Sequence, residues 1–450
     1  MQTSQQCINN ASELSSYRIT IKKILPILFI ALLLVVRVVV CFHLDDGKVE
    51  ADEKSYLSMI VNFADHGRLS YPTSPSIQNG PVEPKKYIAG IRESNRPHDL
   101  FLGYQWLGIL AYLPVVFLSS TKVVVLINNL LYFLSGLIIL KLLNARISRL
   151  QLIAFWVFYL FLPISFTQIS GLGSDMPFLL MLLVTWHAFF RRERIGTLRS
   201  LIALVTLCLT RPLGLIFAGT LVIWNMIRAD YRRVVIASFA LLGAVLLNHI
   251  IGSNSLDVSQ GDRYKNKSLA LVFYCTNSTN GNGNTDTLCW SPEIMSKDTN
   301  LVKYFVGKIS GRELIQEALI QNFHAPIIFL RNNFFKTINY FFNYWPSSWI
   351  LHGGVQSVFT IFTQLSFNLL IITLLSYSLV KFKSEDRTFY AIFFIFSYLY
   401  HMLFLARYRY FVPVLYLGFP IIISLFQYMT CKLSSCFETK AHSEMMTKTE

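Results

Sequence analysis

The chain has 450 residues, of which 53% are hydrophobic and 14% are charged, and its formal net charge is +15 at pH 7. The apolar residues occur in long blocks, so the composition excludes an ordinary soluble domain and predicts an all-α, multi-pass membrane protein. The Lys and Arg residues lie in short clusters between these blocks. This pattern is typical of cytoplasmic membrane loops, so no nucleic-acid partner is expected.

The first apolar block, residues 24–42, follows a polar leader of residues 1–23. No small-residue cleavage site follows the block, so we expect a retained membrane anchor. Arg37 lies near the end of this block, and a side chain that snorkels to the interface explains it. The block is followed by an acidic stretch that begins at Asp45, which places carboxylates at the membrane surface.

One orientation places every basic cluster on the same side of the bilayer, and we adopt it because cytoplasmic loops carry the excess of Lys and Arg. It predicts about ten transmembrane helices, within a range of nine to eleven, with both termini inside. The predicted crossings are residues 24–42, 122–143, 151–169, 177–190, two within 199–227, 234–252, 356–380, 388–405 and 411–430. Residues 199–227 are too short for two crossings of ~20 residues each, and Pro212 supplies a break between them.

Two large extracytoplasmic regions follow from this map, residues 43–121 and 253–355. The apolar stretch from Leu100 to Leu118 would invert all later loops if it crossed the bilayer, so we expect a helix on the outer surface. The predicted organisation is a cytoplasmic leader 1–23, a catalytic transmembrane module 24–252, an outer loop with surface helices 253–355, C-terminal transmembrane helices 356–430 and a cytoplasmic tail 431–450.

The second outer region contains two features of secreted segments. Cys275 and Cys289 lie in one polar loop, where a local disulfide and two free thiols are equal alternatives. Asn266 and Asn277 each begin an Asn-x-Ser/Thr sequence, which is an acceptor for glycosylation only where the source organism modifies such sites.

Asp52, Glu53 and Tyr56 open an amphipathic segment in the first outer region, and Gly67 ends it. Its apolar residues recur at helical spacing, so we expect a surface helix with carboxylates in its first turn. Carboxylates at that position either cap the helix through its dipole or take part in catalysis.

The turn around Asp175, in Gly173-Ser174-Asp175-Met176-Pro177, places a second acidic group on the same outer side. An acidic group at a membrane boundary is costly unless it is paired or functional, and a helix cap is its structural alternative. Arg211 interrupts an apolar run in Thr210-Arg211-Pro212. If the run is broken there, Arg211 lies near the outer bend and could hold an anion such as a phosphate, with snorkelling as the alternative.

Arg407 and Arg409 lie at the predicted outer bend between the last two crossings, on the side where the positive-inside rule expects few cations. A bound anion explains them, and interfacial anchoring beside tyrosines is the competing account. His98, in Arg96-Pro97-His98, is the histidine most suited to a binding role. An aromatic run in the second outer region could form a lipid or sugar groove or an interfacial belt, and it comprises Phe334, Phe335, Tyr340, Phe341, Phe342, Tyr344, Trp345 and Trp349.

The order of these segments resembles that of the polytopic GT-C glycosyltransferases, a superfamily that includes protein O-mannosyltransferases, aminoarabinose transferases and oligosaccharyltransferase catalytic subunits. The resemblance covers most of the chain in layout and only the short segments quoted above in detail. One departure is that Arg96-Pro97-His98 stands where the family usually has a His-Pro-Pro-like sequence. The resemblance implies a GT-C-like fold in the plasma (inner) membrane. It also implies inverting transfer of a sugar from a polyprenyl phosphate to an extracytoplasmic glycan, lipid-linked saccharide or protein.

The resemblance also implies a role for each acidic residue. Asp52 by preference, and Glu53 second, would act as the base that takes the proton of the acceptor hydroxyl. Asp175 would orient the acceptor or the base. No metal is expected, with one alternative in which Asp52 and Asp175 hold a divalent cation.

The remaining residues would bind the substrates and the leaving group. Arg211 and one of Arg407 or Arg409 would stabilise the leaving phosphate. Tyr56 and His98 complete the predicted substrate-binding set, and membrane lipids surround it.

Two other function classes stay open on the residues alone. A cell-surface polysaccharide polymerase or ligase would shift the essential residues to His324 and Arg331 of the second outer region. A transporter of polyprenyl-linked sugars would place charges near the bilayer midplane and show an internal repeat.

Overall fold

The computed structural model describes residues 25–49, 51–72, 80–94, 101, 103–142, 148–166, 171–190, 197–255, 267–279, 296–341, 368–370, 372–377, 380, 385–403, 408–419 and 423. Within these ranges the secondary structure is helical, apart from turns and one isolated antiparallel bridge between Val49 and Val82. The expectation of an all-α protein is therefore confirmed for the described part of the chain.

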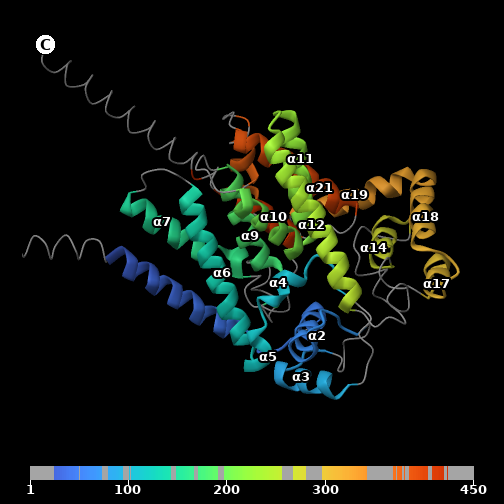
Figure 1. Ribbon diagram of the computed structural model, residues 1–450, viewed down its shortest axis with the longest axis horizontal. Coiled ribbons are helices and arrows are strands. Elements are labelled where there is room, and N and C mark those ends of the chain that lie inside the picture. Colours follow the sequence, from blue (N-terminus) through green and yellow to red (C-terminus); the bar gives the residue numbers. More distant parts are fainter. Residues whose placement is uncertain are drawn as a thin grey trace, which may run out of the picture.

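An N-terminal helix, Leu25–Leu44, precedes the labelled helices of Figure 1. The helices that follow are α2 (Ala51–His66), α3 (Pro84–Glu93), α4 (Trp106–Leu110), α5 (Pro114–Leu118), α6 (Thr121–Leu142), α7 (Arg149–Leu160), α8 (Pro163–Phe166), α9 (Asp175–Phe190), α10 (Thr197–Thr210), α11 (Pro212–Ile227), α12 (Tyr231–Ser255), α14 (Lys267–Asn277), α17 (Thr299–Phe305), α18 (Gly311–His324), α19 (Pro326–Phe341), α21 (Glu385–Leu403) and α22 (Tyr408–Leu417).

Three helices are long and apolar enough to span a bilayer: Leu25–Leu44, Thr121–Leu142 and Tyr231–Asn254. Many of their large apolar side chains are exposed, as lipid-facing residues would be. The chain thus has the character of a membrane protein. Other predicted crossings coincide with shorter apolar helices, among them α7, α9, α10 and α11, so the number of about ten crossings and the GT-C-like arrangement stay predictions.

Helix α10 packs against α9, α11 and α12, and α11 packs against α12, with α6 and α22 against α9 and with α21 against α11. Figure 1 shows this bundle at the centre, with α2 and α3 at one end of it. Most of the buried apolar side chains belong to one continuous core that runs through the bundle into α2 and α3. The predicted catalytic segment is therefore anchored on the same core as the apolar helices.

The predicted break within residues 199–227 is confirmed, because α10 ends at Thr210 and α11 begins at Pro212. Pro212 occupies the first turn of α11, where its missing N–H costs nothing. The two arms meet closely at Gly214, where a Cβ atom would lie 2.4 Å from the carbonyl oxygen of Leu207. Only glycine fits at this contact without a shift of the backbone.

The described part of the apolar stretch 100–118 forms two short helices, α4 and α5, in place of the one predicted helix. Together they span Trp106–Leu118, which is shorter than a bilayer crossing requires. Pro114 begins α5, which explains the interruption because proline supplies no backbone donor to the turn before it.

The predicted snorkelling of Arg37 is wrong, because its side chain is fully buried. Its Nε donates to Asn129 Oδ1 at 2.8 Å, and its Nη1 donates to the carbonyl of Leu160 and, at 2.9 Å, to Ser165 Oγ. The guanidinium carbon also lies 4.5 Å from the ring centre of Tyr132. The sequence offers no sign of these partners, which come from α6, α7 and α8.

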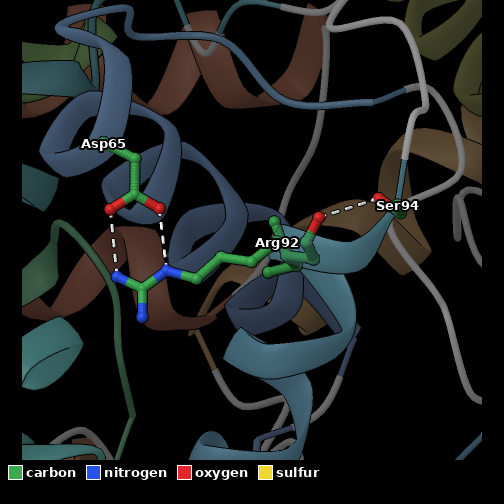
Figure 2. A network of polar contacts seen from close by, with 4 residues as sticks. Asp65, Arg92 and Ser94 are labelled. Carbon is green, nitrogen blue, oxygen red and sulfur yellow. Dashed lines mark hydrogen bonds and ion pairs between the residues drawn. The ribbon is translucent and has the colours of Figure 1, made fainter.

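Contacts at each end of α2 hold it to the segment around α3. The backbones of Val49 and Val82 exchange hydrogen bonds of 2.8 and 3.1 Å across the isolated bridge. Figure 2 shows the second contact, in which Arg92 Nε donates to Asp65 Oδ2 at 2.8 Å and Arg92 Nη2 donates to Asp65 Oδ1 at 3.0 Å. A fork of this kind fixes orientation as well as distance, so α2 is held at both ends.

Within the predicted second outer region, α14, α17 and α18 form a small core of their own around Tyr274, Leu301 and Leu314. Cys275 in α14 is disulfide-bonded, and its predicted partner Cys289 lies outside the described residues. Asn277 is buried, and its side-chain amide donates to the carbonyl of Leu403 at 2.7 Å. The side-chain nitrogen of Asn277 is therefore inaccessible to a glycosylating enzyme in this fold. Asn266 lies outside the described residues.

Candidate functional site

The turn at residues 171–174 is the point where three of the predicted site segments meet. It immediately precedes α9, which begins at Asp175. Glu53, in the first turn of α2, is buried at 4% exposure, and its Oε1 accepts a hydrogen bond of 2.8 Å from the backbone N–H of Leu172. The start of α2 is thereby tied to a turn more than a hundred residues later in the chain.

Asp175 and Arg211 form an ion pair at this turn, in which Arg211 Nη1 donates to Asp175 Oδ1. The side chains are 19% and 7% exposed, respectively, so the pair is mostly shielded from water. Arg211 is the residue between α10 and α11, with an extended backbone that suits a residue before proline. Because the helix pair is broken at this residue, the side chain of Arg211 is directed toward Asp175. In a continuous helix it would lie among apolar neighbours.

Helix α4 fills the space between α2, the turn and the end of α10. Gln105, just before α4, accepts long hydrogen bonds from Tyr56 O–H at 3.4 Å and Ser174 O–H at 3.5 Å. A Cβ atom on Gly108 would lie 2.8 Å from Thr210 Cγ2 and 3.1 Å from Ser174 Cβ. The small residue is required because α4 lies directly against both segments.

Tyr112 and Asn128 form a buried polar link beneath the turn. Tyr112 O–H donates to Asn128 Oδ1 at 2.5 Å, and Asn128 Nδ2 donates to the carbonyl of Gly171 at 3.0 Å. Burial, together with the nearby negative charge of Asp175, raises the pKa of Tyr112 well above its ordinary value. The phenol thus remains a hydrogen-bond donor, which keeps the amide of Asn128 oriented toward the turn.

Asp52 and Glu53 are neighbours in the first turn of α2 but have different environments. Asp52 is exposed, whereas Glu53 is buried and bonded to the turn. An exposed carboxylate is accessible to an acceptor hydroxyl, and a carboxylate that holds a backbone N–H is suited to positioning. The structure therefore distinguishes two residues that the sequence treats as alternatives.

Tyr56 also lies at the turn, because a Cβ atom on Gly173 would be 3.9 Å from its ring carbon Cε2 and 3.3 Å from Asp175 Oδ2. The structure thus brings together Glu53, Tyr56, Asp175 and Arg211 from three separate segments. His98 and Arg407 lie outside the described residues, as does the side chain of Arg409 in α22.

The described residues contain no group of three or more His, Cys, Asp or Glu side chains that could hold a metal ion. Of the two residues predicted for a divalent cation, Asp175 is paired with Arg211, while Asp52 is exposed. The guanidinium of Arg211 disfavours a metal cation at the carboxylate of Asp175. That the protein works without a metal stays a prediction.

Sequence reasoning missed Gln105, Gly108, Tyr112 and Asn128. Only Asn128 carried a usable signal, because two adjacent amides, Asn128-Asn129, interrupt an apolar run that is predicted to cross the membrane. The other residues resemble ordinary members of an apolar segment. Their roles follow from tertiary contacts, which local patterns do not encode.

The two residues that the alternative polymerase or ligase function would require lie away from this turn. His324 is an exposed residue at the end of α18, and Arg331 is exposed on α19. Arg331 Nη2 donates to Asn332 Oδ1 at 3.5 Å, within its own helix.

Comparison of the chain with protein-family models, with curated proteins and with solved structures yields no match.

Proposed function

We propose that this protein is an integral-membrane glycosyltransferase that moves a sugar from a polyprenyl-phosphate donor to an extracytoplasmic acceptor, with inversion at the anomeric carbon. One observation carries the proposal. Glu53 binds the turn at Leu172, and the ion pair of Asp175 with Arg211 closes the same turn. Three segments singled out by their resemblance to GT-C enzymes thus converge, which supports a common role.

In the proposed reaction Asp52 is the general base. Its exposed carboxylate takes the proton of the acceptor hydroxyl while the acceptor oxygen forms a bond to the anomeric carbon. The bond between that carbon and the phosphate oxygen breaks on the opposite face of the sugar, and its electrons go to the lipid phosphate. The proton thus passes from the acceptor to Asp52, and the negative charge passes to the lipid phosphate released from the donor.

Arg211 is proposed to stabilise the charge that develops on the departing phosphate. A guanidinium offers five N–H donors, and the contact to Asp175 engages Nη1. Asp175 holds Arg211 in one orientation before substrate arrives, and such preorganisation lowers the cost of stabilising the transition state. Arg407 or Arg409 is proposed as the second cation.

Glu53 is proposed as a positioning residue. Because its carboxylate accepts the N–H of Leu172, it fixes the turn relative to the first turn of α2 and so sets the distance between Asp52 and Arg211. The acceptor, a glycan, lipid-linked saccharide or protein, would approach from the extracytoplasmic side of the plasma (inner) membrane. No metal is part of the proposed step.

The test is sugar transfer by the purified, full-length protein from a panel of polyprenyl-phosphate sugars, with and without a chelator. Wild type is compared with Asp52→Asn and with Asp46→Asn. Asp46 is an exposed aspartate in the same predicted outer segment, and its Oδ1 accepts a hydrogen bond of 3.1 Å from the backbone N–H of Lys48, two residues away.

We expect Asp52→Asn to lower turnover by about 100-fold or more, as loss of a general base does, and Asp46→Asn to leave it unchanged. Retention of full activity in Asp52→Asn would exclude the proposed base. A wild-type protein that is inactive with every monophosphate donor but active with lipid diphosphates would favour the polymerase or ligase function.

A further inference from the structure

Gln105 is the partly exposed member of a polar cluster beside the turn at residues 171–174. The hydroxyls of Tyr56 and Ser174 both donate to its Oε1, at 3.4 and 3.5 Å. Tyr56 is 9% exposed and Ser174 is 2% exposed, so these two side chains are buried while the carboxamide of Gln105 retains some exposed surface. Within this cluster, Gln105 is thus the group that a ligand can reach.

The two hydroxyls orient the carboxamide of Gln105. A side-chain amide has one acceptor oxygen and a nitrogen that carries two N–H donors. Because Oε1 receives both hydroxyls, it is directed into the cluster, and Nε2 is directed away from them. Gln105 occupies the N-cap position of α4 but does not use its side chain as a cap, and no hydrogen bond to Nε2 occurs among the described residues. Two N–H donors are therefore left for a ligand.

The lengths of these bonds distinguish the cluster from a purely structural network. O–H···O hydrogen bonds in proteins usually measure about 2.5–3.0 Å. The link from Tyr112 to Asn128, beneath the same turn, measures 2.5 Å, and both bonds at Gln105 are longer. Hydrogen bonds of enzyme sites are often long before substrate binds and shorten in the complex. The contacts of Gln105 are those of a group that completes its hydrogen bonding with a ligand.

Close packing fixes the position of Gln105. Helix α4 contacts α2, α9 and α10, and Figure 1 shows it between α2 and the bundle. At Gly108 a Cβ atom would lie 3.1 Å from Ser174 Cβ and 2.8 Å from Thr210 Cγ2, so α4 lies in direct contact with both segments. The start of α4 is thereby held against the turn and against the end of α10, next to Arg211.

Gln105 lies between the proposed base and the proposed phosphate-binding cation. On one side, Tyr56 follows Asp52 by four residues, so both side chains emerge from the same face of α2. On the other side, Ser174 directly precedes Asp175, whose carboxylate pairs with the proposed phosphate-binding arginine. In an inverting transfer, the donor sugar lies between the base that activates the acceptor and the cation that binds the leaving phosphate. The part of the substrate nearest Gln105 is accordingly the donor sugar.

The chemistry of the carboxamide suits a sugar. It is uncharged, so it binds a phosphate less well than a guanidinium does, whereas its N–H donors match the lone pairs of hydroxyl oxygens. We infer that Gln105 contacts the substrate and binds hydroxyl groups of the donor sugar, with Tyr56 and Ser174 holding its carboxamide in place. The inference rests on the proposed function, which supplies a lipid-linked sugar as the ligand. It adds a contact that determines which sugar the site accepts.

The test is a binding measurement that requires no turnover. Purified, full-length protein is titrated with a fluorescently labelled polyprenyl phosphate that carries no sugar. Unlabelled sugar-free lipid and each polyprenyl-phosphate sugar of the panel then compete with it, and fluorescence anisotropy reports the displacement. The affinity for a sugar-bearing lipid divided by that for the sugar-free lipid defines the sugar preference.

The main variant is Gln105→Met, which keeps the length of the side chain without its N–H groups. Gln316→Met is the matched control, because Gln316 is exposed on α18, a helix that packs against α14, α17 and α19. A second variant, Gln105→Glu, keeps an oxygen for the hydroxyls of Tyr56 and Ser174 and removes both N–H donors. Its charge affects both lipids through the phosphate, so the sugar preference stays a valid measure if the methionine variant is unstable in detergent.

For wild type we expect a sugar preference of about 10-fold with at least one lipid of the panel, which is the gain that two neutral hydrogen bonds provide. In Gln105→Met and Gln105→Glu the preference should fall to about one. Gln105→Met should bind the sugar-free lipid as wild type does, and Gln316→Met should match wild type with every lipid.

A sugar preference that Gln105→Met retains, or that wild type shows with no lipid of the panel, would overturn the inference. Equal weakening of both lipids in Gln105→Met would assign the residue to packing alone. A retained preference with a higher KM for the acceptor would assign the amide to the acceptor, which also overturns the inference. The proposed function fails separately, if wild type shows the preference lost in Gln105→Met but transfers no sugar.

Discussion

Arg211 donates a hydrogen bond from Nη1 to the carboxylate of Asp175, a residue 36 positions earlier in the chain. The contact joins the break between α10 and α11 to the first residue of α9. It accounts for two charged groups in a mostly apolar environment, since each neutralises the other. The first prediction follows from this pairing.

Asp175→Asn should lower the free energy of unfolding by about 3 kcal/mol, because it leaves the guanidinium buried without its counter-charge. The double variant Asp175→Asn/Arg211→Gln should be less destabilised than the sum of the single variants, which is the signature of direct coupling. Thermal unfolding in detergent measures both. Asp230→Asn, which breaks the exposed pair of Asp230 with Arg233 at 3.3 Å, serves as control and should cost under ~1 kcal/mol.

The break in this helix pair was predictable, and the ion pair was not. Residues 199–227 are too short for two crossings, and Pro212 interrupts helical hydrogen bonding, so local chemistry alone indicates where the run must divide. The partner of Arg211 depends on how α9 packs beside α10. No local pattern carries that information.

The same reasoning explains the outcome for α2 and Arg37. The start and end of α2 were predicted from acidic residues in the first turn and from Gly67, which has a φ of 70° and ends the helix. Arg37 was misinterpreted because a lone arginine near a helix end usually reaches water. Its acceptors Asn129 and Ser165 lie 92 and 128 residues away.

Arg37→Lys should destabilise the protein although it preserves the charge. A lysine ammonium cannot reproduce the planar fork that contacts Asn129, Leu160 and Ser165 together, so at least one acceptor is left unsatisfied at a cost of about 1–3 kcal/mol. Folded yield and unfolding temperature in detergent report the effect. Val39→Ala, at an exposed position on the same helix, is the matched control, and equal behaviour of the two variants would refute the structural role of Arg37.

Glu53→Gln should preserve stability, because the amide oxygen still accepts the N–H of Leu172. Glu53→Ala removes that acceptor and should cost about 1–3 kcal/mol. In a transfer assay Glu53→Gln should keep most of its turnover, whereas Asp52→Asn should not. If Glu53→Gln loses turnover while remaining as stable as wild type, Glu53 is the base.

The contact between Asp65 and Arg92 predicts a pH-dependent contribution. Hydrogen bonds from Arg92 hold the pKa of Asp65 below its ordinary value of 3.8. A lowered carboxyl pKa stabilises the fold above that ordinary value, and the contribution is lost as pH falls through the pKa of the folded state. Because the pair is partly exposed, we expect under ~1 kcal/mol. The difference in unfolding temperature between wild type and Asp65→Asn should shrink as the pH is lowered from ~6 to ~3.

Asn277 should carry no glycan in the folded protein. Its amide donates to the carbonyls of Phe273 and Leu403, and its Oδ1 accepts from Lys336, so an enzyme has no access to the nitrogen. Peptide mass spectrometry of protein produced in a glycosylating host measures the occupancy. A fully glycosylated Asn277 would contradict the described packing of α14 against α19 and α21.

The close contact at Gly214 has a mechanical consequence. A hinge needs slack between its arms, and here the backbone of α11 already touches the carbonyl of Leu207 in α10. The junction between α10 and α11, which carries Arg211, is therefore rigid and cannot move the guanidinium outward to bind a ligand. Any anion that this arginine serves must travel to it.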